Sequence, residues 1–202
     1  ERGFREVTLL GQNVNSYSDG DSDFADLLKA CAEVDKDLRV RFTTSHPQDL
    51  SDKLLYTISE YSNLCNYIHL PVQSGSDRVL KEMNRTYTIE HYLGIIERAR
   101  KIIPGVTFST DIIAGFPTET EEDHQDTLTL MKYVNYDFGY MFAYSERPGT
   151  LAERKMKDDV PHETKKQRLA EIVALQLKHS QYRTEQFVGK IVEVLIEKSS
   201  KK

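Results

Sequence analysis

Short apolar, β-rich runs alternate with helical patterns along most of the chain, and this alternation narrows the possible folds more than any other feature. The runs are Glu6–Leu10, Arg39–Thr43, Tyr67–Leu70, Thr107–Ile113 and Gly139–Tyr144. Strands that alternate with helices at intervals of roughly 30 residues form βα units on a parallel sheet. So few strands cannot close an eight-stranded barrel, and we predict an α/β fold built as a partial (βα) barrel. Right-handed crossovers would place every strand's carboxyl end on one edge.

The segments between these runs carry apolar residues at helical spacing. The stripes consist of Phe24, Leu27, Leu28 and Cys31; of Leu54, Leu55, Ile58 and Tyr61; of Tyr92, Ile95, Ile96, Ala99 and Ile103; and of Leu128, Met131 and Val134. Thr118 and Glu121 have the spacing of a capping box at the start of the last of these helices. The helical faces also carry histidines that we expect to be solvated: His91, His124, His162 and His179.

The character of the sequence changes after Gly149. A long helix is predicted from about Asp158 to Phe187, Gly189 ends it, and Lys190–Lys198 has the alternation of a new strand. We therefore divide the chain into a barrel core at 1–150, a helical extension at 151–187 and the start of a second, truncated domain at 188–202. Because the chain lacks an initial Met and enters a strand almost at once, we expect it to be cut from a longer protein.

The composition argues against several kinds of site within this chain. Cys31 and Cys65 are the only cysteines and have no ligand spacing, which argues against an iron–sulfur or zinc site. No apolar run reaches the roughly 18 residues of a membrane span, so we expect a cytoplasmic protein without a membrane partner. The net charge of −5 excludes binding to nucleic acid by bulk charge alone, and a local basic patch stays compatible with it.

Polar side chains follow the predicted strands, at the edge where parallel α/β sheets bind ligands. In chain order they are Gln12, Asn13, Ser45, His46, Gln73, Ser74, Asp111, Tyr144 and Arg147. Amides, hydroxyls and a carboxylate suit a polar ligand with amino, carboxylate and ribose parts. The alternative is that these are ordinary polar loops. That alternative accounts better for one cluster than for several that converge on one edge.

Individual positions have two interpretations. Asp111 interrupts an apolar run, where a carboxylate is costly to bury unless paired, so it contacts either a ligand or a neighbouring strand. Arg85, at a predicted helix end, either binds a carboxylate bidentately or sits at the helix C-terminus. Gln73 precedes a helix N-cap and is a candidate ligand contact. His46 is a candidate acid–base group, whereas His69 on a strand is expected to be packed.

Four contiguous blocks carry a resemblance: Leu9–Asn15, His69–Asp77, Asp111–Thr120 and Tyr144–Thr150. They resemble the radical S-adenosylmethionine (SAM) methylthiotransferases, and the similarity extends from Glu6 to about Lys190. The Gly-Gln-Asn-Val-Asn form in the first block is similar to the MiaB-like branch, whose members act on tRNA. The branches that act on a ribosomal protein or on threonylcarbamoyl-adenosine usually differ after this strand.

The resemblance implies an enzyme that adds a methylthio group to C2 of N6-isopentenyladenosine, next to the anticodon of tRNA. Such enzymes carry two 4Fe-4S clusters. One cluster, on a CxxxCxxC loop, cleaves SAM to a 5′-deoxyadenosyl radical, and the other, in an N-terminal domain, supports the transferred sulfur. A second SAM supplies the methyl group. The implied partners are tRNA and an electron donor such as flavodoxin or ferredoxin, and a C-terminal TRAM β-barrel helps to hold the tRNA.

The chain departs from the family pattern because none of the six cluster-binding cysteines is present. We therefore expect a radical SAM partial barrel without its first strand, then a long helix and the first strand of a truncated TRAM barrel. This chain alone is expected to be inactive, and no catalytic or metal-binding residue is assigned in it. The state expected for the protein is a monomer.

The resemblance also assigns candidate contacts by motif block. The residues implied to border SAM are Gln12, Asn13, Ser45, Gln73, Ser74, Arg85, Asp111, Phe142 and Tyr144. The residues implied to face RNA or the target base are His46, Tyr144 and Arg147. Two other functions stay open. One is the same chemistry on another tRNA base or on a ribosomal protein, and the other is an RNA-binding module without clusters.

Overall fold

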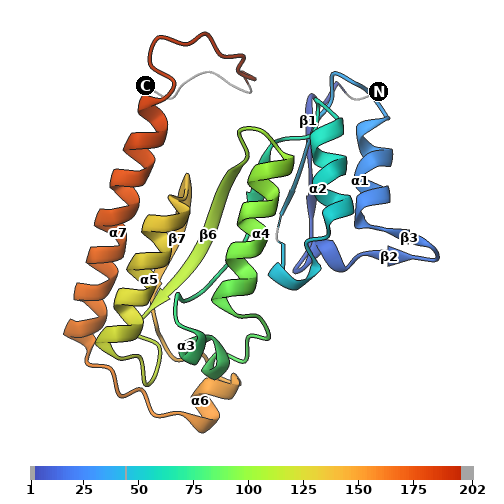
Figure 1. Ribbon diagram of the computed structural model, residues 1–202. Helices are drawn as coiled ribbons and strands as arrows, with labels where there is room; N and C mark the ends of the chain where they lie inside the picture. The colour runs from blue at the N-terminus through green and yellow to red at the C-terminus, as the bar shows by residue number, and fades with distance from the viewer. Residues whose placement is uncertain (1–2, 44, 197–202) are drawn as a thin grey trace.

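Parallel strands, each followed by helical structure, form the framework of the computed structural model, which describes residues 3–43 and 45–196 (Figure 1). The framework strands are β1 (Glu6–Leu10), β4 (Arg39–Thr43), β5 (Tyr67–His69), β6 (Thr107–Ala114) and β7 (Phe138–Ala143). The helices are α1 (Phe24–Ala32), α2 (Asp52–Glu60), α3 (Asp77–Glu82), α4 (Ile89–Ile102), α5 (Glu121–Val134), α6 (Leu151–Lys155) and α7 (His162–Glu185). The described residues also form a hairpin of β2 (Ser18–Asp19) and β3 (Ser22–Asp23). Two short 3-10 turns are η1 (Val14–Ser16) and η2 (Pro47–Asp49). The predicted α/β framework is therefore confirmed, with single-residue shifts at some strand ends.

The framework strands divide into two hydrogen-bonded groups rather than one continuous sheet. Strand β1 pairs with β4, and β5, β6 and β7 pair in that order, with parallel neighbours throughout. Between β4 and β5 the backbone is joined near the ends, where Cys65 N donates to Val40 O and Ser45 N donates to His69 O. The strands thus lie side by side in the order β1-β4-β5-β6-β7, with an opening between the two groups.

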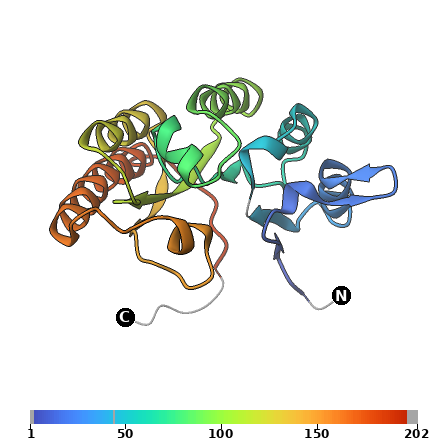
Figure 2. The ribbon, with the colours of Figure 1, turned by 90° about the horizontal axis from the view of Figure 1, so that it is seen from below.

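The two faces of the strands differ because side chains alternate along a strand. In Figure 2 the longer helices α1, α2, α4, α5 and α7 form the outer layer of an arc, the strands line its concave inner side, and α6 lies within the arc. Buried apolar side chains beneath the helices include Val40, Phe42, Ile68, Phe108 and Ile112. By the same alternation the concave side carries polar residues such as Arg41, Tyr67, His69, Ser109 and Asp111. On this side Arg41, Tyr67 and Asp111 are partly exposed, whereas His69 and Ser109 are buried.

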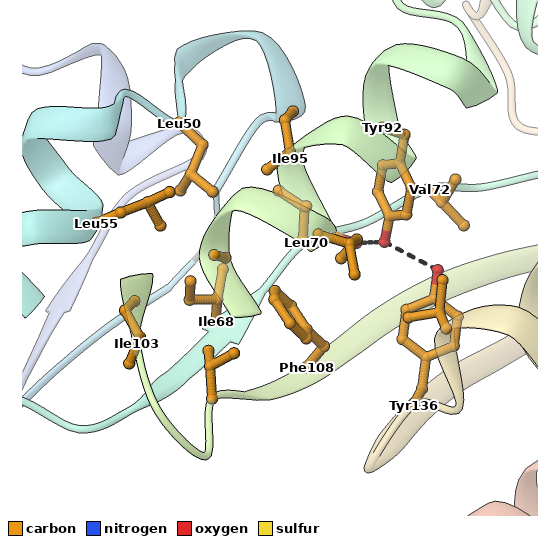
Figure 3. Close-up of a cluster of buried hydrophobic side chains, with 14 of the residues drawn as sticks. Leu50, Leu55, Ile68, Leu70, Val72, Tyr92, Ile95, Ile103, Phe108 and Tyr136 are labelled. Atoms are coloured by element: carbon orange, nitrogen blue, oxygen red, sulfur yellow. Dashed lines mark hydrogen bonds between the residues drawn. The ribbon is translucent and has the colours of Figure 1, made fainter. Parts of the chain in front are cut away.

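The core lies between the covered face of the strands and the outer helices (Figure 3). Two fully buried tyrosines extend hydrogen bonding into it. Tyr136 Oη donates to Tyr92 Oη over 2.9 Å, and Tyr92 Oη donates to the carbonyl of Leu70 over 2.9 Å. Burial raises the pKa of both phenols above the ordinary value of 10. These two consecutive hydrogen bonds connect α4 and the start of β7 to the end of β5.

The helices α1 to α6 begin at Ser, Thr or Asp N-caps, whose side chains accept a backbone N–H of the first turn. The capping box predicted at Thr118 and Glu121 is wrong by two residues. Helix α5 begins at Glu121, Thr120 is its N-cap, and Asp123 returns the second hydrogen bond. Thr118 instead lies in the preceding turn with a φ of 70°, and its N–H donates to Asp159.

Helix α7 packs along β6, β7 and α5. Gln176 Nε2 donates to Tyr136 O over 3.0 Å, and Arg183 Nη2 donates to Asn135 O over 2.9 Å. The domain boundaries at residues 150 and 187 stay predictions, but this helix covers the sheet as α4 and α5 do. None of the helices in the described ranges has the length and apolar character that a membrane span requires.

The strand predicted at Lys190–Lys198 is not formed in its described part. Residues 190–196 have no regular secondary structure, and Ile191 and Ile196 are exposed. The sequence alternates as expected, but within the described ranges no other strand lies beside it to complete a ladder. The rest of that strand, and residues 197–202 of the truncated domain, lie outside the described residues.

Candidate functional site

A cavity of about 450 Å³ opens at the carboxyl ends of β5, β6 and β7. The end of α3 and the segment around α6 close it from the other side. The predicted site residues that line this cavity are Gln73, Arg85, Asp111, Phe142, Tyr144 and Arg147. They come from four separate stretches of the sequence, and the fold brings together those that follow strands as the strand-end argument predicted. The volume falls within the roughly 300–1,000 Å³ of small-molecule sites.

Gln73 is held in an unusual backbone conformation at the end of β5. Its φ is 71°, in the left-handed region that residues other than glycine seldom adopt. The backbone is fixed on both sides, because Gln73 N donates to Asp111 O over 2.8 Å and Ile113 N donates to Gln73 O over 2.9 Å. The side-chain amide makes no hydrogen bond within the described residues, so it is available to a ligand. Strained positions of this kind cluster at functional sites.

Arg85 reaches the cavity because of the way α3 ends. Asn84 has a φ of 57°, Arg85 N donates to Leu80 O, and Asn84 N donates to Lys81 O. These two bonds form a Schellman motif, which reverses the chain directly after the helix. The Arg85 guanidinium is partly exposed and has no ion pair within the described part of the chain. It is therefore free to bind a carboxylate or a phosphate.

Asp111 supplies the carboxylate of the site. It lies on the concave side of β6, its side chain is 28% exposed, and Oδ1 is 3.5 Å from Nε2 of His69. The structural interpretation is therefore confirmed, since Asp111 contacts the neighbouring strand; it also lines the cavity, and its contact with a ligand stays a prediction. Within the described ranges, the remaining carboxylate oxygen has no protein donor and can accept from a ligand hydroxyl or amino group.

An aromatic wall limits the cavity on the side of β7. Phe116 and Tyr144 meet edge to face with 5.1 Å between ring centroids, and Phe142 lines the same space. The ammonium group of Lys165 lies 5.0 Å from the centroid of the Tyr144 ring. Burial raises the pKa of Tyr144, helped by the nearby carboxylates of Glu146 and others. The wall offers flat apolar surface on which a purine ring could stack.

Helix α7 supports this wall from behind. Lys165 Nζ pairs with Asp158 over 2.5 Å, and its buried stem packs on Gly115, whose φ of 72° keeps the chain close to the helix. One turn further on, Arg168 Nη1 donates to Glu119 Oε1 over 2.9 Å, and the same oxygen accepts Gly115 N over 2.9 Å. The turn between β6 and α5 is thus fastened to the last helix.

The other predicted residues lie outside the cavity. Asn13 donates to Asp49 over 2.5 Å, and its Oδ1 is buried without a partner among the described residues, as is Ser45 Oγ. Gln12 is exposed. Ser74 is fully buried and accepts Ser76 N. Asn13 and Ser45 therefore have unused polar atoms at the strand ends beside the cavity, whereas Ser74 serves the loop itself.

His46 caps η2 next to the site without lining it. Its Nδ1 accepts Gln48 N, and its ring meets Tyr87 edge to face at 5.5 Å. Burial lowers the pKa of His46, and the positive charge of Arg85 acts in the same direction against the opposing effect of Asp49. Burial also raises the pKa of Tyr87 to about 12.

Sequence reasoning missed several residues that shape the cavity. Phe116 comes two residues after the end of β6, within the block Asp111–Thr120, but it was not assigned to the site. Thr150 and Leu151 line the cavity from the start of α6, and the Arg-Pro-Gly turn before them was the available signal. Lys165 had no signal, because its role depends on contacts with residues far away in the chain.

A metal centre finds no support in the residues that the structure describes. Among them, no group of three or more His, Cys, Asp or Glu side chains could hold a metal ion. Cys31 packs beside the core, and Cys65 is half-buried at the amino-terminal side of β5, with its pKa raised by burial.

Comparison with known proteins agrees with this geometry. The family model described as the radical SAM superfamily matches residues 1–131. The chain belongs to the radical SAM superfamily. Solved radical SAM structures share the fold: coproporphyrinogen III oxidase (HemN) from Escherichia coli has a TM-score of 0.68 at 20% identity, over 87% of this chain and 40% of that one. Methylornithine synthase (PylB) has a TM-score of 0.61 at 16% identity, over 88% of this chain and 49% of its own.

Curated relatives within the superfamily are more similar in sequence. The chain is 56% identical to the tRNA-2-methylthio-N(6)-dimethylallyladenosine synthase of Christiangramia forsetii and 55% identical to that of Flavobacterium johnsoniae. Both comparisons cover 100% of this chain and 46% of the relative. The chain therefore spans about half the length of the curated relatives it matches. The radical SAM superfamily expected from the four sequence blocks is confirmed, and the methylthiotransferase branch stays a proposal.

Proposed function

We propose that this chain is the SAM-binding core of an enzyme that adds a methylthio group to C2 of N6-isopentenyladenosine in tRNA. The observation that carries the proposal is the cavity at the carboxyl ends of β5, β6 and β7, which gathers Gln73, Arg85 and Asp111 with side chains free to bind a ligand. The relatives named for this reaction, at 55–56% identity over the whole chain, support the choice of substrate.

The cavity residues fit the parts of SAM. Arg85 matches the methionine carboxylate, because a guanidinium binds carboxylates in a bidentate manner. Asp111 matches the ribose hydroxyls, which can donate to a carboxylate. Phe142 and Tyr144 match the adenine ring, and Gln73 can donate and accept between them. When bound, SAM supplies the transferred methyl group and the adenosyl group that activates the substrate carbon.

Two buried orphan atoms support a ligand that extends toward β4. Asn13 Oδ1 and Ser45 Oγ are buried, and neither has a hydrogen-bond partner within residues 3–43 and 45–196. A buried polar atom without a hydrogen bond costs about 1–3 kcal/mol, so a ligand donor or water at these atoms would be favourable. The amino group of SAM is a donor of this kind.

The iron–sulfur clusters of the family do not fit the residues of this chain. Its only cysteines, Cys31 and Cys65, cannot supply the three thiolates of one cluster. We therefore derive no step through a cluster here. The activity, the tRNA contacts and the reductant belong to the whole protein. We propose flavodoxin or ferredoxin as the reductant.

The RNA would approach from the side of α6. Arg147 is exposed at the cavity rim and can contact phosphate or stack on a base. Tyr144 would lie between SAM and the target adenosine, and His46 would face the same opening across Arg85. We further propose that the protein acts as a monomer in the cytoplasm, where its tRNA substrate is found.

The test uses the full-length protein that contains this chain, purified without oxygen and with its clusters reconstituted. It is given SAM, a reductant and tRNA with or without the isopentenyl group. We expect 2-methylthio-N6-isopentenyladenosine by mass spectrometry of the nucleosides from the first tRNA only. Equal product from the unmodified tRNA would overturn the choice of substrate, and absence of both product and SAM cleavage would overturn the proposal.

Site variants connect this activity to the cavity. Arg85→Met and Asp111→Asn each remove a charged contact worth about 1.5–3 kcal/mol, so we expect SAM affinity to fall about tenfold or more. Arg98→Met is the matched control, because Arg98 pairs with Asp52 on the outer helices. Unchanged SAM affinity in Arg85→Met and Asp111→Asn would show that the ligand lies elsewhere.

A further inference from the structure

A line of polar side chains crosses the concave face beside the cavity. In the parallel register of β5 and β6, Tyr67 lies opposite Thr107 and His69 lies opposite Ser109. The Ser109 hydroxyl is 2.6 Å from Tyr67 Oη and 2.7 Å from His69 Nδ1. His69 and Ser109 are buried, so these contacts are shielded from water.

The hydrogen-bond chemistry allows two directions along this line for a neutral imidazole. A serine hydroxyl has one proton, so it donates to only one of its two neighbours. If Ser109 donates to His69 Nδ1, it accepts from Tyr67, and the ring proton lies on Nε2. If the direction is reversed, the lone pair of Nε2 faces Oδ1 of Asp111, which is 3.5 Å away.

The first direction is favoured because the second sets a lone pair against a carboxylate. In the first direction, Nε2 carries the ring proton and lies 3.5 Å from Asp111 Oδ1, where an N–H is electrostatically more favourable beside a carboxylate than a lone pair. The ring is also held in place from the side, since it meets Tyr140 edge to face at 6.0 Å. Tyr140 in turn packs on Phe138 at 4.9 Å between ring centroids.

We infer that His69, oriented by Tyr67 and Ser109, is a positioning residue that holds the Asp111 carboxylate in its orientation toward the cavity. It contacts no ligand itself and acts through Asp111. The ligand chemistry that this arrangement selects is a hydroxyl or amino donor, and with respect to SAM the inference rests on the proposed function. His69 therefore does more than fill space on a strand.

The variants separate orientation from packing. His69→Leu keeps a side chain of similar size and removes the N–H. His69→Gln restores a donor near the place of Nε2. Ser109→Ala removes the group that fixes the ring proton. Thr107→Val is the matched control, because it also removes a hydroxyl from β6. The Thr107 hydroxyl bonds Asn66 O and not His69.

SAM affinity of the full-length, reconstituted protein is the first measurement. We expect about tenfold weaker binding for His69→Leu, a smaller loss for Ser109→Ala and recovery of most of the affinity in His69→Gln. Thr107→Val is expected to bind as the wild type does. If His69→Leu binds within twofold of wild type while Asp111→Asn is weakened, the inference is overturned. It is also overturned if His69→Gln binds as weakly as His69→Leu.

The ring tautomer is the second measurement and needs no ligand. Side-chain ¹⁵N NMR at pH 8 distinguishes the proton on Nε2 from that on Nδ1, and His69→Gln identifies the signal. We expect the Nε2–H form in the wild type and a shifted or averaged signal in Ser109→Ala. An Nδ1–H or doubly protonated ring overturns the inference. If the wild type binds no SAM, the proposed function fails, and this measurement still decides the role of His69.

Discussion

Gly75 allows the loop that carries Gln73 to lie directly against helix α5. A β-carbon on Gly75 would be 2.6 Å from both Asp126 O and Thr127 N, which are backbone atoms of that helix. Side chains could rotate away from such a contact, but helix backbone cannot. Gly75 N also donates to Thr127 Oγ1 over 2.9 Å. Gly75→Ala should therefore push the loop and the helix apart.

The cost can be worked out from these contacts. Overpacking of a tight site costs about 1–3 kcal/mol, and loss of a buried hydrogen bond adds about 1 kcal/mol. We expect Gly75→Ala to lower the free energy of unfolding by about 3 kcal/mol, which corresponds to a melting temperature roughly 6–12 °C lower for a chain of this size. Because Gln73 is two residues away, SAM affinity should fall as well.

Thermal unfolding followed by far-ultraviolet circular dichroism measures this effect. Gly94→Ala is the matched control, since Gly94 lies within α4 and an added β-carbon would meet only Arg98 at 3.6 Å. Alanine is favoured over glycine inside a helix by about 1 kcal/mol, so the control should raise the melting temperature. If Gly75→Ala melts at the wild-type temperature, the close approach of loop and helix is not as described.

Three further predictions concern buried polar groups. Tyr92→Phe should destabilise the fold by about 2–3 kcal/mol in urea unfolding, more than Tyr136→Phe, because Tyr92 both donates and accepts. Arg168→Met leaves Glu119 buried without its cation, and we expect a loss of about 3–5 kcal/mol; a double variant with Glu119→Gln should recover part of it. Burial alone would raise the pKa of Asp123, but hydrogen bonds from Arg78 and its neighbours outweigh this and lower the pKa below the ordinary 3.8. Its stabilisation is therefore complete above about pH 4 to 5 and lost at lower pH, so the difference in unfolding free energy between wild type and Asp123→Asn should shrink from pH 7 to pH 3.

Local pattern was enough to predict the framework of the fold. The apolar runs and helical stripes have strong periods, and the parallel arrangement follows from their alternation. Because the carboxyl ends of parallel strands lie on one edge of the sheet, the sequence alone predicted that Gln73 and Asp111 lie on the same edge. The predicted tail strand at residues 190–198 shows the limit of this reasoning, because alternation alone does not supply a neighbouring strand.

Contacts between distant segments account for what the sequence did not reveal. His124 was predicted to be solvated on a helical face, but it is buried, and its Nε2 lies 2.7 Å from Glu171 on α7. Lys165 was not singled out, although it supports the wall of the cavity. Both outcomes depend on where α7 packs, and that helix has a weak apolar stripe. Its position is set by pairs such as Arg168 with Glu119, which no local pattern predicts.

The packing of Lys165 on Gly115 couples the last helix to the proposed ligand site. A force or a binding partner that pulls α7 off the sheet must also loosen the ring of Tyr144. The reason is that Lys165, on α7, contacts both this ring and Gly115. Such coupling is reciprocal: if docking of α7 strengthens ligand binding, a bound ligand strengthens docking of α7 by the same free energy. Ligand binding in the cavity and docking of α7 on the sheet are then coupled parts of one equilibrium.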